Sequence, residues 1–182
     1  EKITQGEVVP EFENAISSKL NSKYAIAVNS ATSALHLSCL ALGVGEGDFV
    51  WTSPISFVAS ANCALYCGAK IDFVDIDPNS GLLDVKKLES KLETAKINNS
   101  IPKVIIPVHL TGSSCDMKVI YTLSKKYGFS IIEDASHAIG GKYNNNYVGN
   151  CKYSSLTVFS FHPVKIITTG EGGLVTTNNK KL

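Results

Sequence analysis

Residues 24–33 read Tyr-Ala-Ile-Ala-Val-Asn-Ser-Ala-Thr-Ser, so an apolar run is followed at once by small polar residues. An apolar run of this length is typical of a buried strand, and Ser or Thr typically opens a helix. The leucines that follow continue the helix, and Gly43 or Gly45 is placed to end it. This segment therefore predicts a strand that leads directly into a helix.

The same strand-then-helix unit recurs along the chain. We predict further strands over residues 49–52, 71–74, 103–108, 130–134, 156–160 and 173–177. We predict further helices that begin near Pro10, cover about 57–67, follow a capping Asp84 and cover 117–127. Because strands and helices alternate, we expect an α/β fold of three layers, α/β/α, with a mainly parallel, mixed sheet between the helices.

The composition fits a soluble globular protein of 182 residues, 44% hydrophobic and 18% charged. A chain of this length fits one domain with a substantial core. All 17 basic residues are lysines, and 16 acidic residues balance them to a net charge of +1. This balance provides no basic stripe for a nucleic acid, and no apolar run reaches the roughly 18 residues of a membrane span. We therefore expect neither nucleic acid nor membrane as a partner.

The chain has five cysteines, an odd number without a Cys-x-x-Cys pair. Unpaired thiols of this kind indicate a reducing compartment, so we expect the protein to be cytoplasmic. Cys63 and Cys67 are four residues apart, but no pair of histidines accompanies them. We expect them to pack as small apolar residues, and we expect no metal site.

Polar residues stand where several predicted strands end. They are Ser30 to Thr32, Thr52 and Ser53, His109, Glu133 and Asp134, and Ser160. Ligands of open α/β sheets bind beyond the carboxyl ends of the strands, so these residues indicate a site there. The hydroxyl residues at 30–33 open a helix, where free N–H groups and the helix dipole favour a phosphate. The same residues could serve only as a helix cap.

Each of three further residues could have either a chemical role or a purely structural one. Asp134 could face the ligand or cap a helix. Lys165 lies among apolar residues, which favour a neutral amine that can form a Schiff base with an aldehyde, but most lysines simply lie on the surface. Phe57 could cover a flat cofactor or belong to the core. Together, a phosphate cup, an aromatic face, a carboxylate and a lysine are what pyridoxal 5'-phosphate (PLP) requires.

Four segments carry a resemblance to a known family. They are residues 29–36 (Asn-Ser-Ala-Thr-Ser-Ala-Leu-His), 52–62 (Thr-Ser-Pro-Ile-Ser-Phe-Val-Ala-Ser-Ala-Asn), 133–138 (Glu-Asp-Ala-Ser-His-Ala) and 159–173, which holds Phe-Ser-Phe-His-Pro-Val-Lys and Thr-Thr-Gly-Glu-Gly-Gly. In this order they resemble the DegT/DnrJ/EryC1/StrS family of PLP-dependent nucleotide-sugar aminotransferases, along essentially the whole chain. Within the family the chain is most similar to the UDP-4-amino-4,6-dideoxy-N-acetyl-β-L-altrosamine transaminase branch, which catalyses a step toward pseudaminic acid.

The resemblance assigns roles to individual residues. It implies that Lys165 bonds to the cofactor's aldehyde and that Asp134 pairs with the pyridine nitrogen. It also implies that Phe57 stacks on the ring and that His137 lies near the phenolic oxygen. The phosphate would be held by backbone groups of Thr32 and Ser33 and by the hydroxyl of Ser160. Lys165, Asp134 and His137 would be the catalytic residues.

The resemblance also implies an activity and an assembly. The chain would be the PLP-binding large domain of a fold-type-I aminotransferase, residues 1–182, which aminates a UDP-linked 4-keto-6-deoxy amino sugar with L-glutamate as donor. The family has an additional small domain and a homodimer partner that completes each site, so we expect this chain to be an incomplete enzyme. Family members that remove a hydroxyl carry His at the Schiff-base position, and Lys165 favours transamination. A sugar dehydratase and a non-catalytic PLP-binding or nucleotide-sugar-binding regulator remain the alternatives.

Overall fold

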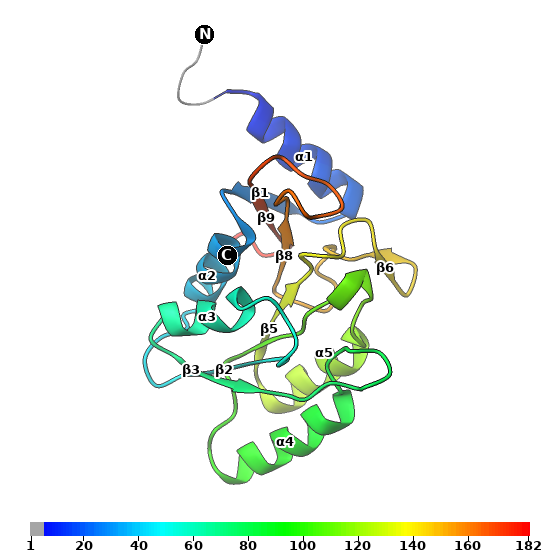
Figure 1. Cartoon of the computed structure of the whole chain (residues 1–182). Helices are drawn as coiled ribbons and strands as arrows, with labels where there is room; N and C mark the ends of the chain where they lie inside the picture. The colour runs from blue at the N-terminus through cyan, green and yellow to red at the C-terminus, as the bar shows by residue number, and fades with distance from the viewer. Residues whose placement is uncertain (1–5) are drawn as a thin grey trace.

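The computed structural model describes residues 6–182, and a sheet of seven strands runs through its centre (Figure 1). The strands of this sheet are β1 (Tyr24–Val28), β2 (Phe49–Thr52), β3 (Lys70–Phe73), β4 (Val104–Ile106), β5 (Ser130–Asp134), β8 (Leu156–Ser160) and β9 (Gly173–Thr177). A separate hairpin joins β6 (Lys142–Tyr143) to β7 (Asn146–Tyr147). The helices are α1 (Val8–Leu20), α2 (Ala31–Ala41), α3 (Ala59–Tyr66), α4 (Val85–Ile97), α5 (Met117–Tyr127) and the short 3₁₀ helix η1 (Leu110–Gly112).

The strand order is β1-β9-β8-β5-β4-β2-β3, and only β9 runs against its neighbours. The pairs β8/β5, β5/β4, β4/β2 and β2/β3 are parallel. The predicted mainly parallel, mixed sheet is therefore confirmed. Because the other six strands run the same way, their carboxyl ends share one edge, where β9 begins.

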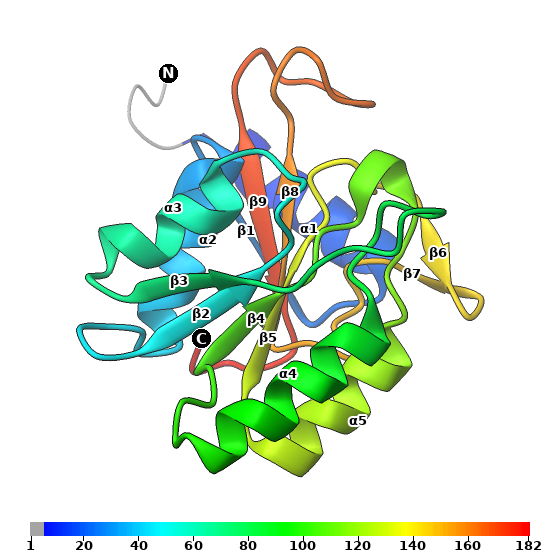
Figure 2. The same cartoon turned by 60° about the horizontal axis from the view of Figure 1, so that its bottom comes forward.

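Alternate residues of the strands build the core on both faces of the sheet. On one face, Val50, Val104 and Ile132 pack with buried residues of α2 and α3. On the other face, Trp51 and Ile105 pack with α4 and α5, while Phe159 and Leu174 pack with α1. Figure 2 shows α2 and α3 on one side of the sheet and α4 and α5 on the other. The predicted three-layer α/β/α architecture is thus confirmed.

Local sequence signals fix the ends of several elements. The side chain of Asp84 accepts hydrogen bonds from the amides of Lys86 and Lys87, as expected for the cap of α4. Asn144 and Asn145 take positive φ values of 48° and 62° in the tight turn of the small hairpin. Asn tolerates this left-handed conformation, which hairpins of this kind require.

Several predicted boundaries are wrong. The strands predicted over 71–74 and 103–108 cover Lys70–Phe73 and Val104–Ile106, and two helix starts also differ. Helix α1 begins at Val8, so Pro10 lies inside the first turn, where its missing N–H needs no partner in the helix. Helix α3 begins at Ala59, two residues later than expected, and Phe57 belongs to the preceding loop. Among residues 6–182, no helix is long and apolar enough to cross a membrane.

Candidate active site

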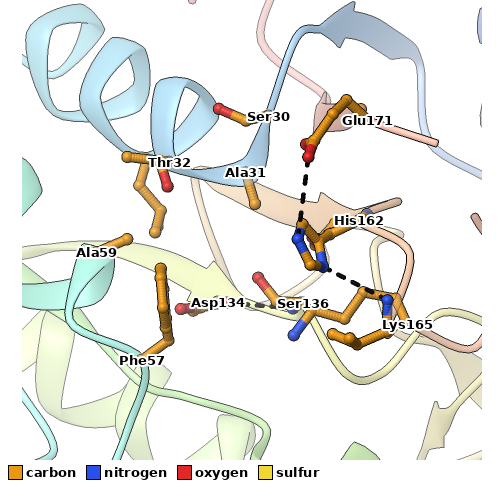
Figure 3. A pocket seen from close by; sticks show the side chains of 14 residues that line it. Ser30, Ala31, Thr32, Phe57, Ala59, Asp134, Ser136, His162, Lys165 and Glu171 are labelled. Carbon is orange, nitrogen blue, oxygen red and sulfur yellow. Dashed lines mark hydrogen bonds and ion pairs between the residues drawn. The ribbon is translucent and has the colours of Figure 1, made fainter. Parts of the chain in front are cut away.

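A cavity of about 240 Å³ lies at the sheet edge where β5 and β8 end and where α2 begins (Figure 3). It collects residues from five separate segments of the chain. They are Ser30, Ala31, Thr32, Leu35, Phe57, Ala59, Asp134, Ser136, Ser160, His162, Val164, Lys165, Glu171 and Gly172. The edge predicted from the strand ends is therefore the edge that carries this cavity.

The amino terminus of α2 forms one wall of the cavity. Ser30 caps the helix in an extended conformation, and its side chain accepts a hydrogen bond from the amide of Ser33 at 3.2 Å. The amides of Ala31 and Thr32 have no acceptor among the described residues, as is usual in a first helical turn. No acidic residue occupies this turn. The helix dipole and two free N–H groups therefore favour an anion at this wall.

Gly173 allows α2 to begin this close to the sheet. It is the first residue of β9 and pairs with Val28 on one side and Ser160 on the other. A Cβ atom at this position would overlap the backbone of Ser30 and Ala31. A side chain here would push the helix terminus away from the cavity, so Gly173 is required by the close approach of two backbones.

Asp134 is the carboxylate at the floor of the cavity. The residue is only 4% exposed, and both carboxylate oxygens accept hydrogen bonds from the protein. Ser60 Oγ donates to Oδ2 at 2.6 Å, and the amide of Ser136 donates to Oδ1 at 3.1 Å. Asp134 ends β5 and the residues after it form no helix, so the helix-cap interpretation is not supported.

The loop between β8 and β9 carries two nitrogen-bearing side chains of the cavity, those of Lys165 and His162. Lys165 is half-buried, and its amide donates to the carbonyl of His162 at 2.9 Å. The imidazole Nε2 of His162 lies 3.9 Å from Oε1 of Glu171. Figure 3 shows Lys165 and His162 on the side of the cavity opposite Phe57. The amine of Lys165 thus shares one small space with a carboxylate and an aromatic ring.

Phe57 is not a core residue. Its side chain is 68% exposed, far more than the buried aromatic residues of the sheet. It stands in the loop between β2 and α3 and lines the cavity. An aromatic ring that remains exposed beside a cavity is available to cover a flat ligand.

His137 lies beside the cavity but is not among the residues that line it. Its Nδ1 accepts a hydrogen bond from the amide of Thr111 at 3.4 Å. Burial lowers the pKa of His137, and the nearby charge of Lys165 lowers it further, while Asp134 opposes both. The ring is therefore neutral near pH 7, and its proton resides on Nε2.

The sequence-based site residues divide into two groups. Thr32, Phe57, Asp134, Ser160 and Lys165 line the cavity. Ser33 and His137 do not. The amide of Ser33, which the resemblance assigned to the phosphate, already donates to Ser30 Oγ.

Four other polar residues predicted at strand ends do not line the cavity, and the buried Ser53 is one of them. Thr52 is buried, and its hydroxyl donates to the carbonyl of Ile106. His109 and Glu133 contact each other on the opposite face of the sheet, with 2.8 Å between Nε2 and Oε2. Glu133 lies in β5 as predicted, whereas β4 ends at Ile106 and His109 follows it in a loop. Successive side chains of a strand point to opposite faces, so Glu133 points away from the cavity that Asp134 lines.

The structure adds site residues that the sequence interpretation did not assign. Ser60 and Ser136 hold Asp134, and Ala31, His162, Glu171 and Gly172 line the cavity. The sequence gives one indication for Ser60. It follows Phe57 by three residues at the start of the predicted helix, and this spacing can place both side chains on the same face of a helix. Glu171 and His162 could not be paired from the sequence, because the loop between them decides their separation.

The family model for the DegT/DnrJ/EryC1/StrS aminotransferase family matches residues 1–182. The chain belongs to this family. The UDP-4-amino-4,6-dideoxy-N-acetyl-β-L-altrosamine transaminase of Campylobacter jejuni is 47% identical over 182 residues, which are 100% of this chain and 46% of that protein. The family resemblance and the similarity to this branch are therefore confirmed.

Solved structures of family members superpose closely on the chain. One of them is Helicobacter pylori PseC, an aminotransferase involved in the biosynthesis of pseudoaminic acid, with a TM-score of 0.86 and 38% sequence identity. The superposition includes 98% of this chain and 46% of the PseC chain. NtdA of Bacillus subtilis with bound cofactor PMP has a TM-score of 0.85 at 34% identity, with 98% of this chain and 38% of that chain covered. The chain thus spans about half the length of the curated relatives it matches.

Proposed function

We propose that this chain is the PLP-binding large domain of an aminotransferase that aminates a UDP-linked 4-keto-6-deoxy amino sugar. The observation that carries the proposal is the convergence of Lys165, Asp134 and the amino terminus of α2 on one cavity. These three features come from segments far apart in the sequence. The proposal is further supported by the similarity to sugar aminotransferases and by the cofactor in a solved relative.

The residues of the cavity fit PLP, because each polar part of the cofactor would find a group of matching chemistry. The free amides of Ala31 and Thr32 and the hydroxyl of Ser160 would bind the phosphate. Asp134 would bind the protonated ring nitrogen, and Phe57 would cover the ring face. Bound PLP supplies an electron sink for the substrate's α-carbon.

The chain's own residues would orient substrate and move protons around that group. The amine of Lys165 would take the proton from Cα of the amino donor and return a proton at the acceptor carbon. The neutral ring of His137 would donate a hydrogen bond from Nε2 toward the cofactor's phenolic oxygen. Phe57 and α2 would exclude water from one side of the cavity.

L-glutamate is the proposed amino donor, and a second subunit is the proposed partner. The chain has no arginine, whose forked guanidinium is the usual partner of a carboxylate or diphosphate. Groups for the glutamate and the nucleotide would then come from a second domain and from a homodimer partner. The exposed apolar residues beside the cavity, Val164, Ile166 and Ile167, support such a contact. The five free cysteines fit a reducing compartment such as the cytoplasm.

Lys165 separates this proposal from dehydration on the same fold. The resemblance associates dehydratases with a histidine at this position, and the cavity here holds a lysine amine. A regulator without turnover would need the same cofactor pocket but no proton transfer by Lys165.

The test uses the protein that carries this chain, incubated with PLP, L-glutamate and a UDP-linked 4-keto-6-deoxy amino sugar. We expect formation of 2-oxoglutarate in a 1:1 ratio with the aminated sugar, and no reaction of a Lys165→Ala variant. Loss of a sugar hydroxyl without consumption of glutamate would instead identify a dehydratase. PLP binding without any product would identify a regulator.

A further inference from the structure

We infer that Ser60 is a positioning residue for Asp134, and that Ser56 supports it through a chain of two hydroxyl groups. This inference rests on the proposed function, because it deepens the role of the carboxylate in PLP binding. It concerns a contact between the helix α3 and the strand β5, whose contacting residues are 74 positions apart in the sequence.

The contact between Ser60 and Asp134 is short and buried. The distance between Ser60 Oγ and Asp134 Oδ2 is 2.6 Å, within the range for a hydroxyl that donates to a carboxylate. Ser60 is 0% exposed, and Asp134 is 4% exposed. Water cannot readily replace the serine hydroxyl at this depth, so the orientation of the carboxylate depends on the protein.

The direction of the hydroxyl chain follows from the inventory of donors. A serine hydroxyl has one proton, and the proton of Ser60 is directed at the carboxylate. Ser56 Oγ lies 2.7 Å from Ser60 Oγ, so Ser56 must donate to Ser60. The order is Ser56 to Ser60 to Asp134, and each donation polarises the next one.

The other carboxylate oxygen of Asp134, Oδ1, is held by the backbone. The amide of Ser136 donates to Asp134 Oδ1 at 3.1 Å. A helix side chain and a backbone amide therefore fix the two oxygens independently, which determines the plane of the carboxylate. The ring nitrogen of PLP needs a carboxylate in a defined plane, because a hydrogen bond weakens steeply when it is bent.

The two linked hydroxyl groups of Ser56 and Ser60 also connect Asp134 to the loop that carries Phe57. Ser56 precedes Phe57, and Ser60 is the second residue of α3. The loop that carries Phe57 is thus bonded to the carboxylate at the floor of the cavity. This arrangement would fix the position of Phe57 relative to that of Asp134.

The test compares Ser60→Ala with Ser38→Ala in the protein that carries this chain. Ser38 is a matched control, because its hydroxyl is also buried, at 2% exposure, but has no hydrogen-bond partner among the described residues. Both changes remove one buried oxygen. Ser56→Ala removes only the outer link and should have the smaller effect.

Two measurements are made on each variant. In crystals of the cofactor-free protein, we expect Asp134 to rotate or to adopt two conformers in Ser60→Ala and to be unchanged in Ser38→Ala. By absorbance titration, we expect Ser60→Ala to weaken PLP binding about tenfold and to shift the pH dependence of the bound cofactor's spectrum, with wild-type values for Ser38→Ala.

An unchanged Asp134 conformer in Ser60→Ala overturns the inference, and so do equal PLP affinities and spectra for Ser60→Ala and wild type. Equal losses in the Ser60 and Ser38 variants also overturn it, because they would show a general packing effect. If wild type binds no PLP, the proposed function fails, and the crystal comparison still decides whether Ser60 positions Asp134.

Discussion

Glu133 and Asp134 are consecutive in β5, yet their carboxylates lie on opposite faces of the sheet. Asp134 faces the cavity, whereas Glu133 accepts hydrogen bonds from His109 at 2.8 Å, Ser154 at 2.5 Å and Thr157 at 3.0 Å. Successive side chains of a strand point to opposite sides, so one strand end provides a site carboxylate and a structural carboxylate. The two should respond differently to substitution.

Glu133→Gln should destabilise the fold. Burial would raise the pKa of Glu133, but hydrogen bonds from His109, Ser154 and Thr157 hold it below its ordinary value. His109 Nδ1 accepts the amide of Cys115, so Nε2–H points at Glu133. A glutamine has only one accepting oxygen, so it cannot accept from His109 and from the hydroxyl groups of Ser154 and Thr157 together. We expect a loss of roughly 2 kcal/mol in urea unfolding at pH 7.

The pH dependence of that loss gives a second check. Because the folded pKa is below the unfolded one, the carboxylate stabilises the fold above the unfolded pKa of 4.5, and this contribution disappears as pH falls through the folded value. Wild type and Glu133→Gln should thus converge in acid. The exposed carboxylate of Glu89, paired with Lys126, is the control, and Glu89→Gln should leave stability unchanged. A difference in the free energy of unfolding between wild type and Glu133→Gln that stays constant at all pH values would contradict the account.

Asp134→Asn should preserve the fold and remove most activity. An asparagine can still accept from Ser60 or Ser136, but it cannot supply the negative charge opposite the ring nitrogen. We expect turnover to fall by about a hundredfold or more, with little change in melting temperature. Activity within a few-fold of wild type would show that Asp134 is structural.

Gly173→Ala should weaken PLP binding through the position of α2. The added methyl group would overlap the backbone of Ser30 and Ala31 and displace the phosphate-binding wall. Such overpacking costs about 1–3 kcal/mol of stability. Gly45→Ala is a suitable control, because nothing lies within 4 Å of its added Cβ. Equal PLP affinity and stability in the two variants would refute the close-approach argument.

The titration of His137 should report the charges of the cavity. NMR of the cofactor-free protein should give a pKa below 6.5, because burial and Lys165 both disfavour the imidazolium. Lys165→Ala should raise this pKa, and Asp134→Asn should lower it further. Since the unfolded state binds the proton more readily, His137 makes the fold less stable as pH falls through 6.5. A lower pKa of His137 in Lys165→Ala, or a higher one in Asp134→Asn, would contradict this arrangement of charges.

Much of the fold could be predicted because local patterns decide it. The apolar run at 24–28 and the hydroxyl residues after it specify both a strand and the start of α2. The reversal of β9 could not be predicted. Residues 173–177 are equally apolar in either direction, and their pairing with β1 depends on a partner about 150 positions away.

The site could be predicted in part for a related reason. Asp134 stands out as a carboxylate that ends the apolar strand β5, and Lys165 stands out as a lysine among apolar residues in the loop after β8. The contact of Ser60 with Asp134 spans 74 positions, and no local pattern specifies it. Strand alternation could have excluded Glu133 from the cavity, because its neighbour Asp134 was already assigned to it.

Whether Lys165 bonds covalently to PLP is the central question. The most direct measurement is borohydride reduction of the protein after incubation with PLP, followed by digestion and mass mapping of the peptides. The account predicts a pyridoxyl modification on Lys165, and its loss in Lys165→Ala, while the other 16 lysines remain unmodified at stoichiometric cofactor. A modification on another lysine, or none at all, would contradict the assignment of this cavity as a PLP site.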